Sequence, residues 1–222
     1  MLFDSVSYIC VEGVIGAGKT SLSQILSQRY NWELMLEDFE SNPFLTDFYK
    51  DRESVAFQTE LWFLLQRYRQ ILRTLTEIDL FHPVVVSDYM FMKQRMFCMV
   101  NLDENEQKLF NDMERTFREY IPSPEFVIYL RTSTEKLMQR INRRDRDFEK
   151  NISTDYIEKL NNSYEDFFRH YKTSPLCVIN TDSLDFVNRD EDREKIIEVI
   201  EGMEGVYVSY APEDSNQRIF DR

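Results

Sequence analysis

Short apolar segments alternate with longer amphipathic segments along most of the chain. Near-continuous apolar runs, rich in β-branched residues, occur at 5–11, 33–36, 83–88, 125–130 and 176–180, and polar or turn residues bound each run. Strands that are apolar at almost every position are typical of a parallel sheet covered on both faces. The pattern therefore predicts five buried parallel strands.

The segments between these runs show helical periodicity. In 55–76, leucine and tyrosine side chains recur every three or four residues, which places them on one stripe of a helix. Asp103 and Glu106 have the spacing of a capping box at a helix start. A helix is expected to begin near Lys19, and further helices are predicted at 103–120, 133–147, 153–171 and 190–203.

Strands that alternate with helices predict one doubly wound α/β domain. A chain of 222 residues is long enough for one such domain and marginal for two. Because the pattern shows neither an internal repeat nor an interdomain linker, we expect a single domain over 1–210. The polar segment 211–222 is expected to form a flexible tail.

Charge and cysteine usage narrow the range of partners. A formal net charge of −13 disfavours nucleic acid or an anionic membrane as the main partner. Residues 131–150 form a local basic segment that suits a small anionic ligand. Cys10, Cys98 and Cys177 each lie in an apolar run, which indicates buried free thiols in a reducing compartment. With no secretory signal or bilayer-length apolar run, we expect a cytoplasmic protein.

One glycine-rich segment carries a specific chemical signal. It follows the first predicted strand, precedes a helix and fits the pattern G-x-x-x-x-G-K-[ST], in which backbone N–H groups and a lysine surround the phosphates of a nucleotide. The threonine hydroxyl of such a loop is a Mg²⁺ ligand. The residues expected to bind ATP here are Gly13, Val14, Ile15, Gly16, Ala17, Gly18, Lys19 and Thr20.

The loop alone leaves open a switch GTPase, an ATP-driven motor and a small-molecule kinase. Residues 140–146 contain four arginines, of which Arg140 and Arg144 share one helix face. Fixed guanidinium groups stabilise the charge that develops during phosphoryl transfer. The cluster favours a kinase, although a solvated basic helix face is an alternative. The lack of an N-K-x-D motif disfavours a GTPase.

Several further segments, in the same order along the chain, resemble the deoxynucleoside kinase family of deoxycytidine, deoxyguanosine and deoxyadenosine kinases. The resemblance covers about residues 7–205 and is strongest toward bacterial members. It implies a P-loop kinase fold whose five-stranded parallel sheet is flanked by helices, with an arginine-rich lid at about 140–152. The segments are LEDFESNPFL (36–45), FYK (48–50), FQTELWFLLQRYRQ (57–70), VVVSDYMF (84–91), RINRRDRDFE (140–149) and NTDSLDFV (180–187).

The resemblance implies ATP-dependent phosphorylation of a deoxynucleoside, with a lean toward purines, at its 5′-hydroxyl in nucleotide salvage. It also implies Mg²⁺, a homodimer and specific residue roles. Glu37 would be the general base, assisted by Lys19, Arg140, Arg144 and Arg146. The expected substrate-binding residues are Tyr49, Gln58, Trp62, Asp88, Phe91, Gln94 and Glu149; Thr20 and Asp88 would hold the metal, and Asp185 and Phe186 would pack on the adenine of ATP.

These roles have ordinary structural alternatives. An amide such as Gln58 offers both a donor and an acceptor to a base edge, but it also suits a helix surface. Trp62 and Phe91 could flank the base, although aromatic residues at helical spacing equally suit a core. Glu37 lies in an acidic loop, and Asp88 could simply cap a turn at the end of a strand.

The chain departs from the family pattern at two places. After the third strand the family usually has Asp/Glu-Arg-Ser, whereas residues 88–90 are Asp-Tyr-Met, so a substrate-contacting arginine is missing. Arg95, one helical turn later, is a possible substitute, or the lid arginines suffice. An aspartate that often reads the base is replaced by Gln94, and its usual arginine partner aligns with Leu65. The base preference therefore stays open.

Two other functions remain open. A nucleoside monophosphate kinase, such as one for thymidylate, shares the phosphate loop and lid, but its acceptor is anionic. Segment 31–49 contains five acidic residues and no lysine or arginine, which favours a neutral acceptor. The missing arginine also allows a catalytically weak regulatory subunit that binds nucleotide.

Overall fold

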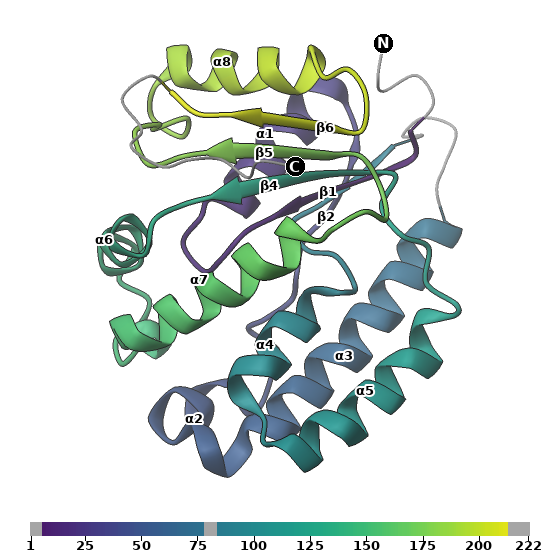
Figure 1. The fold of residues 1–222 in the computed structure, drawn as a ribbon, viewed down its shortest axis with the longest axis vertical. Helices are drawn as coiled ribbons and strands as arrows, with labels where there is room; N and C mark the ends of the chain where they lie inside the picture. The colour runs from purple at the N-terminus through teal and green to yellow at the C-terminus, as the bar shows by residue number, and fades with distance from the viewer. Residues whose placement is uncertain (1–5, 78–83, 213–222) are drawn as a thin grey trace.

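A parallel β-sheet forms the centre of the computed structural model, which describes residues 6–77 and 84–212 (Figure 1). All five neighbouring strand pairs in it are parallel. The order across the sheet confirms the predicted doubly wound α/β class. From one edge to the other the strands are β2 (Glu33–Met35), β3 (Val85–Ser87), β1 (Tyr8–Glu12), β4 (Phe126–Arg131), β5 (Leu176–Asn180) and β6 (Tyr207–Tyr210).

The described sheet has six strands, so the prediction of five is wrong. The missed strand is β6, which pairs with β5 in a register that places Leu176 opposite Tyr207. Its sequence is only Tyr-Val-Ser-Tyr, and every residue keeps some exposure because the strand lies at the edge of the sheet. A search for continuously buried apolar runs does not detect such a strand.

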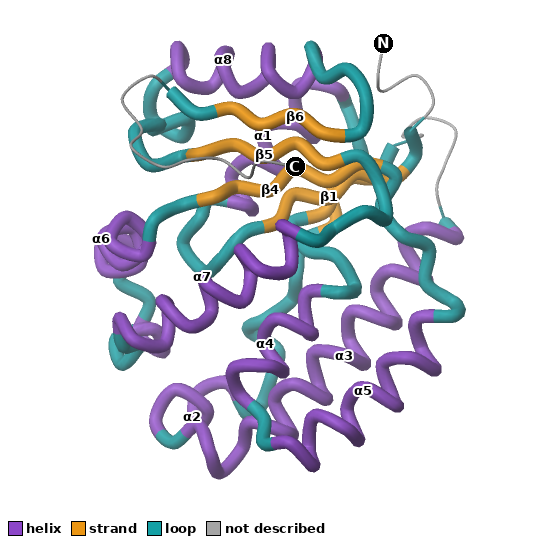
Figure 2. The backbone as a smooth tube through the Cα atoms, viewed as in Figure 1, coloured by secondary structure: helices purple, strands orange, loops and turns teal. Residues whose placement is uncertain are grey.

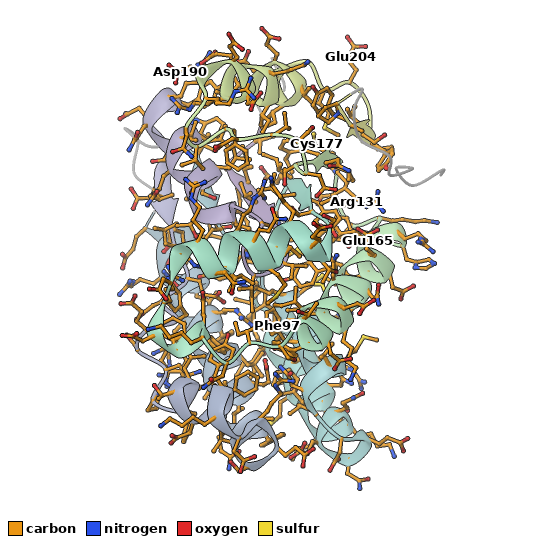
Figure 3. The ribbon with its side chains drawn as sticks, turned by 90° about the vertical axis from the view of Figure 1, so that its left-hand side faces the viewer. Phe97, Arg131, Glu165, Cys177, Asp190 and Glu204 are labelled. Carbon is orange, nitrogen blue, oxygen red and sulfur yellow. The ribbon has the colours of Figure 1, made fainter. Side chains whose placement is uncertain are left out.

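The core is densest at the middle strands. Every residue of β1 and β5 is buried. Tyr129 of β4 stacks on Phe168 with ring centroids 4.1 Å apart, which fixes a helix against the sheet. Cys10, Cys98 and Cys177 are buried free thiols, as predicted, and Cys177 lies on β5 (Figure 3).

Most helices lie close to their predicted ranges (Figure 2). The capping box is confirmed, because the Asp103 carboxylate accepts from Glu106 N while the Glu106 carboxylate accepts from Asp103 N. Sequence patterns did not predict α2 (Leu45–Lys50), α4 (Lys93–Asn101) or the short 3₁₀-helix η2 (Asp147–Glu149). The predicted helices are α1 (Lys19–Tyr30), α3 (Arg52–Thr76), α5 (Glu104–Arg118), α6 (Thr134–Arg144), α7 (Thr154–Arg169) and α8 (Asp190–Glu201).

The helices are distributed on both faces of the sheet. Figure 1 shows α1 behind the strands, α7 in front of them, and α2, α3, α4 and α5 gathered below. Arg131 on β4 and Glu165 on α7 form an ion pair, with Nε 2.7 Å from Oε1, and lie beside each other in Figure 3. This ion pair connects the sheet to α7.

The predicted lid helix ends earlier than 147. Asp145, which follows Arg144, is in the left-handed conformation with φ of 50°. The helix therefore ends at Arg144. The chain then continues through Arg146 into η2, which holds Glu149 at the bottom of the lid.

Within the described ranges no helix is long and apolar enough to cross a bilayer. Most of the predicted tail, residues 213–222, lies outside the described part of the chain.

Candidate active site

The glycine-rich loop curves between the end of β1 and the start of α1. Gly16 and Gly18 adopt positive φ angles of 87° and 101°, and α1 begins at Lys19. The Lys19 ammonium donates to the Val14 carbonyl oxygen at 3.0 Å. Burial, together with the charge of the nearby Lys93, lowers the pKa of Lys19 to about 8. A bound triphosphate would supply the negative charge that this buried ammonium lacks.

Gly18 has two reasons to be glycine. Its φ is unfavourable for other residues, and an added Cβ would lie 2.7 Å from Phe186 Cζ. Gly205 has a positive φ of 81° as well, but none of the described atoms lies within 4 Å of a Cβ added there. Substitutions at both glycines strain the backbone, but only one at Gly18 also creates a steric overlap. Comparing the two positions therefore separates the two effects.

We therefore expect Gly18→Ala to destabilise the fold more than Gly205→Ala. The strained backbone alone costs about 1–3 kcal/mol, and displacement of Phe186 adds to it at Gly18. Urea unfolding of the two variants measures the difference. Equal losses of unfolding free energy would show that Phe186 does not press on the loop.

A cavity of about 420 Å³ lies beside the loop and contains the predicted ATP contacts Asp185 and Phe186 in its wall. Arg140 also lines it, but its guanidinium is committed to backbone oxygens: it donates to Ala17 O at 3.2 Å and to Thr181 O at 2.7 Å. Arg140 thus ties the phosphate loop to the segment after β5. It positions the loop while the remaining lid arginines face the cavities.

A second cavity extends from the same loop toward α3 and α4. Lys19, Glu37 and Asp88 line it. Gly16 and Arg144 belong to the walls of both cavities, so the two spaces meet beside the phosphate loop. The rest of the wall includes Phe39, Leu45, Phe48, Tyr49, Thr59, Glu60, Phe63, Arg67, Lys93, Phe97, Arg146, Phe148 and Glu149.

Glu37 is held by two cations. Its Oε1 lies 2.7 Å from Arg67 Nε and 2.6 Å from Arg67 Nη2, and its Oε2 lies 2.6 Å from Lys93 Nζ. Burial alone would raise the pKa of Glu37, but the charges of Arg67 and Lys93 outweigh that effect and lower it to about 2. The carboxylate is ionised throughout the neutral range.

Asp88 connects the loop to the Glu37 segment. Its Oδ2 accepts from the Thr20 hydroxyl at 2.5 Å, and its Oδ1 accepts from Glu37 N at 2.8 Å. A hydroxyl and a carboxylate this close are suitable ligands for Mg²⁺, which takes one or two protein oxygens and completes its shell with phosphates and water. No cluster of three or more His, Cys, Asp or Glu side chains elsewhere in the described ranges forms a metal site.

The residues predicted to hold the sugar come together at the lid. Arg144 contacts both carboxylate oxygens of Glu149, with Nη2 2.5 Å from Oε1 and Nε 3.1 Å from Oε2. Tyr49 stacks on Phe148 with centroids 6.0 Å apart. The guanidinium of Arg146 lies 4.5 Å above the Phe39 ring. The lid is thus closed against the segment that follows β2.

Three predicted base contacts are not brought to the cavity. Gln58 is exposed on α3, because it lies two residues, or about 200° around the helix, from the cavity-facing Glu60. Trp62 packs edge-on against Phe63, and Phe91 is buried in the core; neither lines the cavity. The family motif gives the order of these residues along the chain but not which of them face the cavity.

Gln94 reaches the site indirectly. It is fully buried, and its Oε1 accepts from Arg67 Nη1 at 3.3 Å. Arg67, two residues after Leu65, therefore provides an arginine partner for Gln94. A signal for it exists in the sequence: Arg67 falls on the buried stripe of α3 between Leu64 and Ile71, where an unpaired cation would be unfavourable.

Arg95 does not replace the missing substrate-contacting arginine. Its Nη2 pairs with Glu114 at 3.1 Å, away from the cavity. Lys93 and Arg67 instead supply positive charge to Glu37. Lys93 was missed because it opens a helix that the sequence pattern did not predict.

The phosphate loop, the parallel sheet and the arginine-bearing lid define a P-loop kinase. Residues 9–203 match the family model for deoxynucleoside kinase. The chain is 32% identical over 197 residues to deoxyguanosine kinase of Bacillus subtilis (strain 168), covering 87% of this chain and 95% of the relative. It is 31% identical over 211 residues to deoxyadenosine kinase of Lactobacillus acidophilus, covering 88% and 95%.

The solved structures agree. A deoxyadenosine kinase from M. mycoides with bound dATP superposes with a TM-score of 0.76 at 27% identity, over 88% of this chain and 100% of that chain. This chain belongs to the deoxynucleoside kinase family.

Proposed function

We propose that this kinase transfers the terminal phosphoryl group of ATP to the 5′-hydroxyl of a purine deoxynucleoside, as a step of nucleotide salvage. The observation that carries the proposal is the position of Glu37. It lines the second cavity with Lys19, Gly16 and Arg144, and the last two also line the cavity beside the phosphate loop. A hydroxyl bound at Glu37 would face the terminal phosphate across Gly16 and Arg144.

In the proposed reaction Glu37 accepts the proton of the 5′-hydroxyl. The 5′-oxygen forms a bond to the terminal phosphorus as the bond between that phosphorus and the bridging oxygen breaks, and ADP leaves. Lys19, Arg144 and Arg146 stabilise charge on the transferred group. Mg²⁺, when bound at Thr20 and Asp88, neutralises phosphate charge. Tyr49 and Glu149 hold the 3′-hydroxyl, which favours a sugar whose 3′-hydroxyl is free.

The metal assignment gives a direct prediction. In Asp88→Asn we expect the Mg²⁺ concentration for half-maximal activity to rise about 10–100-fold, because the carboxylate beside Thr20 loses its charge. A Mg²⁺ titration of initial rates measures it. The control is Asp38→Asn, an exposed residue of the neighbouring loop that bonds to Ser41. An unchanged half-saturation point in Asp88→Asn would remove Asp88 from the metal site.

A nucleoside monophosphate as the acceptor has less support. Both cations nearest the proposed 5′ position, Arg67 and Lys93, are paired with Glu37. A 5′-phosphate would have to compete with that carboxylate. The regulatory-subunit hypothesis has less support as well, because Glu37, Lys19, Arg144 and Arg146 line one cavity.

We further propose that residues 1–210 act as one domain with a lid at about 140–152, in a cytoplasmic homodimer. The buried free thiols support a reducing compartment. The apolar stripe of α3 packs within the chain, whereas Met99 and Leu109 are 63% and 54% exposed on α4 and α5 and could face a partner. Light scattering after size exclusion tests the dimer.

The test of the function is a substrate panel. The protein is incubated with ATP, Mg²⁺ and each of the four natural deoxynucleosides, and the monophosphates are quantified. We expect turnover of at least one purine deoxynucleoside at a higher kcat/KM than the pyrimidines. Turnover of deoxynucleoside monophosphates alone, or of none of these acceptors, would overturn the proposal.

A further inference from the structure

The wall of the second cavity contains a carboxylate that the proposed transfer chemistry does not use. Glu60 lines the cavity from α3 and is 2% exposed. Its Oε1 accepts from Asn101 Nδ2 at 2.7 Å, which fixes the orientation of the carboxylate. Its Oε2 is buried and has no hydrogen-bond partner among the described residues. A buried, unpartnered carboxylate oxygen in a cavity wall is unfavourable unless a ligand donates to it.

Donors and aromatic rings surround this carboxylate. Phe63 lies one helical turn after Glu60 on α3, and Phe97 lies one turn before Asn101 on α4; both rings line the cavity. Two turns after Glu60, Arg67 directs N–H groups to Glu37 and to Gln94. A guanidinium has five N–H donors, so Arg67 retains donors for a ligand. The site therefore combines stacking surfaces, a fixed acceptor and a fixed donor.

This combination matches one base. Guanine presents two adjacent donors, N1–H and N2–H, followed by the O6 acceptor. A carboxylate can accept from both donors at once, and an arginine can donate to O6. Adenine and cytosine each place a ring-nitrogen acceptor beside their amino group, and that acceptor would face a carboxylate oxygen. Thymine has a single N–H between two acceptors.

We propose that Glu60 reads the nucleobase and, together with Arg67, makes this kinase select deoxyguanosine over deoxyadenosine. The proposal rests on the proposed function and assigns the base that the function leaves open. It also places base recognition two residues beyond Gln58, on the opposite side of α3. Glu60 acts as a specificity-determining residue, and the transfer chemistry is left to Glu37.

The decisive variant is Glu60→Gln. Its amide has the same shape but offers one acceptor and one donor, which complements the amino group and N1 of adenine. We expect the ratio of kcat/KM for deoxyguanosine to that for deoxyadenosine to fall by roughly 100-fold or more, because one buried pair becomes mismatched for guanine and matched for adenine. The matched control is Glu53→Gln, an exposed glutamate of the same helix, whose ratio should equal that of the unmodified protein.

A second measurement uses the unmodified protein and does not depend on a variant that folds. Burial raises the pKa of Glu60 to about 7, and the charge of Arg67 opposes this effect. Guanine requires the ionised carboxylate, which predominates above that pH, whereas a protonated carboxyl group can donate to N1 of adenine. The deoxyguanosine to deoxyadenosine ratio should therefore rise between pH 6 and pH 8, and it should be flat in Glu60→Gln. The charged and titratable groups that face Glu60 are Arg67 on α3, Glu37 after β2, Lys93 and Cys98 on α4, and Tyr156 on α7.

The outcomes are separable. A ratio that is unchanged in Glu60→Gln and independent of pH would overturn the proposal, while turnover of any deoxynucleoside would leave the proposed function intact. If Gln58→Ala changes the ratio and Glu60→Gln does not, the base is read from the other side of α3. Failure of the unmodified protein to phosphorylate any deoxynucleoside would overturn both the function and the selection of guanine.

Discussion

Replacing Glu37 by glutamine is expected to lower kcat about 10²–10⁴-fold, because the amide cannot accept the proton of the 5′-hydroxyl. The effect should fall on kcat more than on the KM of the deoxynucleoside, since the side chain keeps its size and one acceptor oxygen. Initial rates with saturating ATP and Mg²⁺ measure it. Because the pKa of Glu37 is about 2, the base stays ionised, and its own titration should not produce an acid limb between pH 5 and pH 8.

The control for this variant is Glu40→Gln, an exposed acidic residue of the same loop. Removing the charge of Glu37 also leaves Arg67 and Lys93 without their shared partner in a buried place, so a loss of stability is expected. Thermal unfolding identifies the temperature at which both variants are folded, and the rates are compared there. A Glu37→Gln enzyme with the rate of the Glu40→Gln control would exclude Glu37 as the base.

Replacing Lys19 by methionine is expected to lower kcat/KM for ATP about 10²–10³-fold, the usual loss when one preorganised charge is removed from a transferring group. The methionine fills a similar volume, and the lost contact to Val14 O is a single hydrogen bond. Since burial already lowers the pKa of Lys19 to about 8, its removal should not destabilise the nucleotide-free protein.

Steady-state rates at varied ATP concentration measure the Lys19 effect. The matched control is Lys50→Met, because Lys50 is exposed and pairs with the exposed Asp47 in a surface contact. Equal kcat/KM values for the two variants would show that the loop lysine does not contact the transferred phosphate.

Much of the fold could be predicted because its signals are local. Continuous apolar runs reveal strands that are buried on both faces, and the glycine-rich loop can be recognised from its spacing alone. β6 was not predicted because an edge strand of four half-exposed residues has neither a continuous apolar run nor a recognisable motif. α4 was not predicted because it is short and begins without a side-chain cap at Met92.

The sequence motifs located several residues of the site along the chain. They were less able to predict which side chains meet in the folded protein. Motif order located Glu37, Asp88 and Glu149, and the structure brings all three to one cavity. The phase of α3 could not be taken from a motif: Gln58 and Glu60 are two residues apart but face opposite sides of the helix. Arg67 lies far from Glu37 in sequence, so their pairing is a tertiary contact that only the packing of α3 against the sheet edge creates.

The central claim is that a neutral 5′-hydroxyl binds between Glu37 and the phosphate loop. The most direct test is a crystal structure of the enzyme with ADP and the deoxynucleoside that it phosphorylates best, in which the distance from the 5′-oxygen to the Glu37 carboxylate is measured. We predict a hydrogen bond of about 2.6–3.2 Å, with the 5′-oxygen facing the loop. A nucleoside bound with its 5′-oxygen away from Glu37, or a Glu37 carboxylate turned out of the cavity, would contradict it.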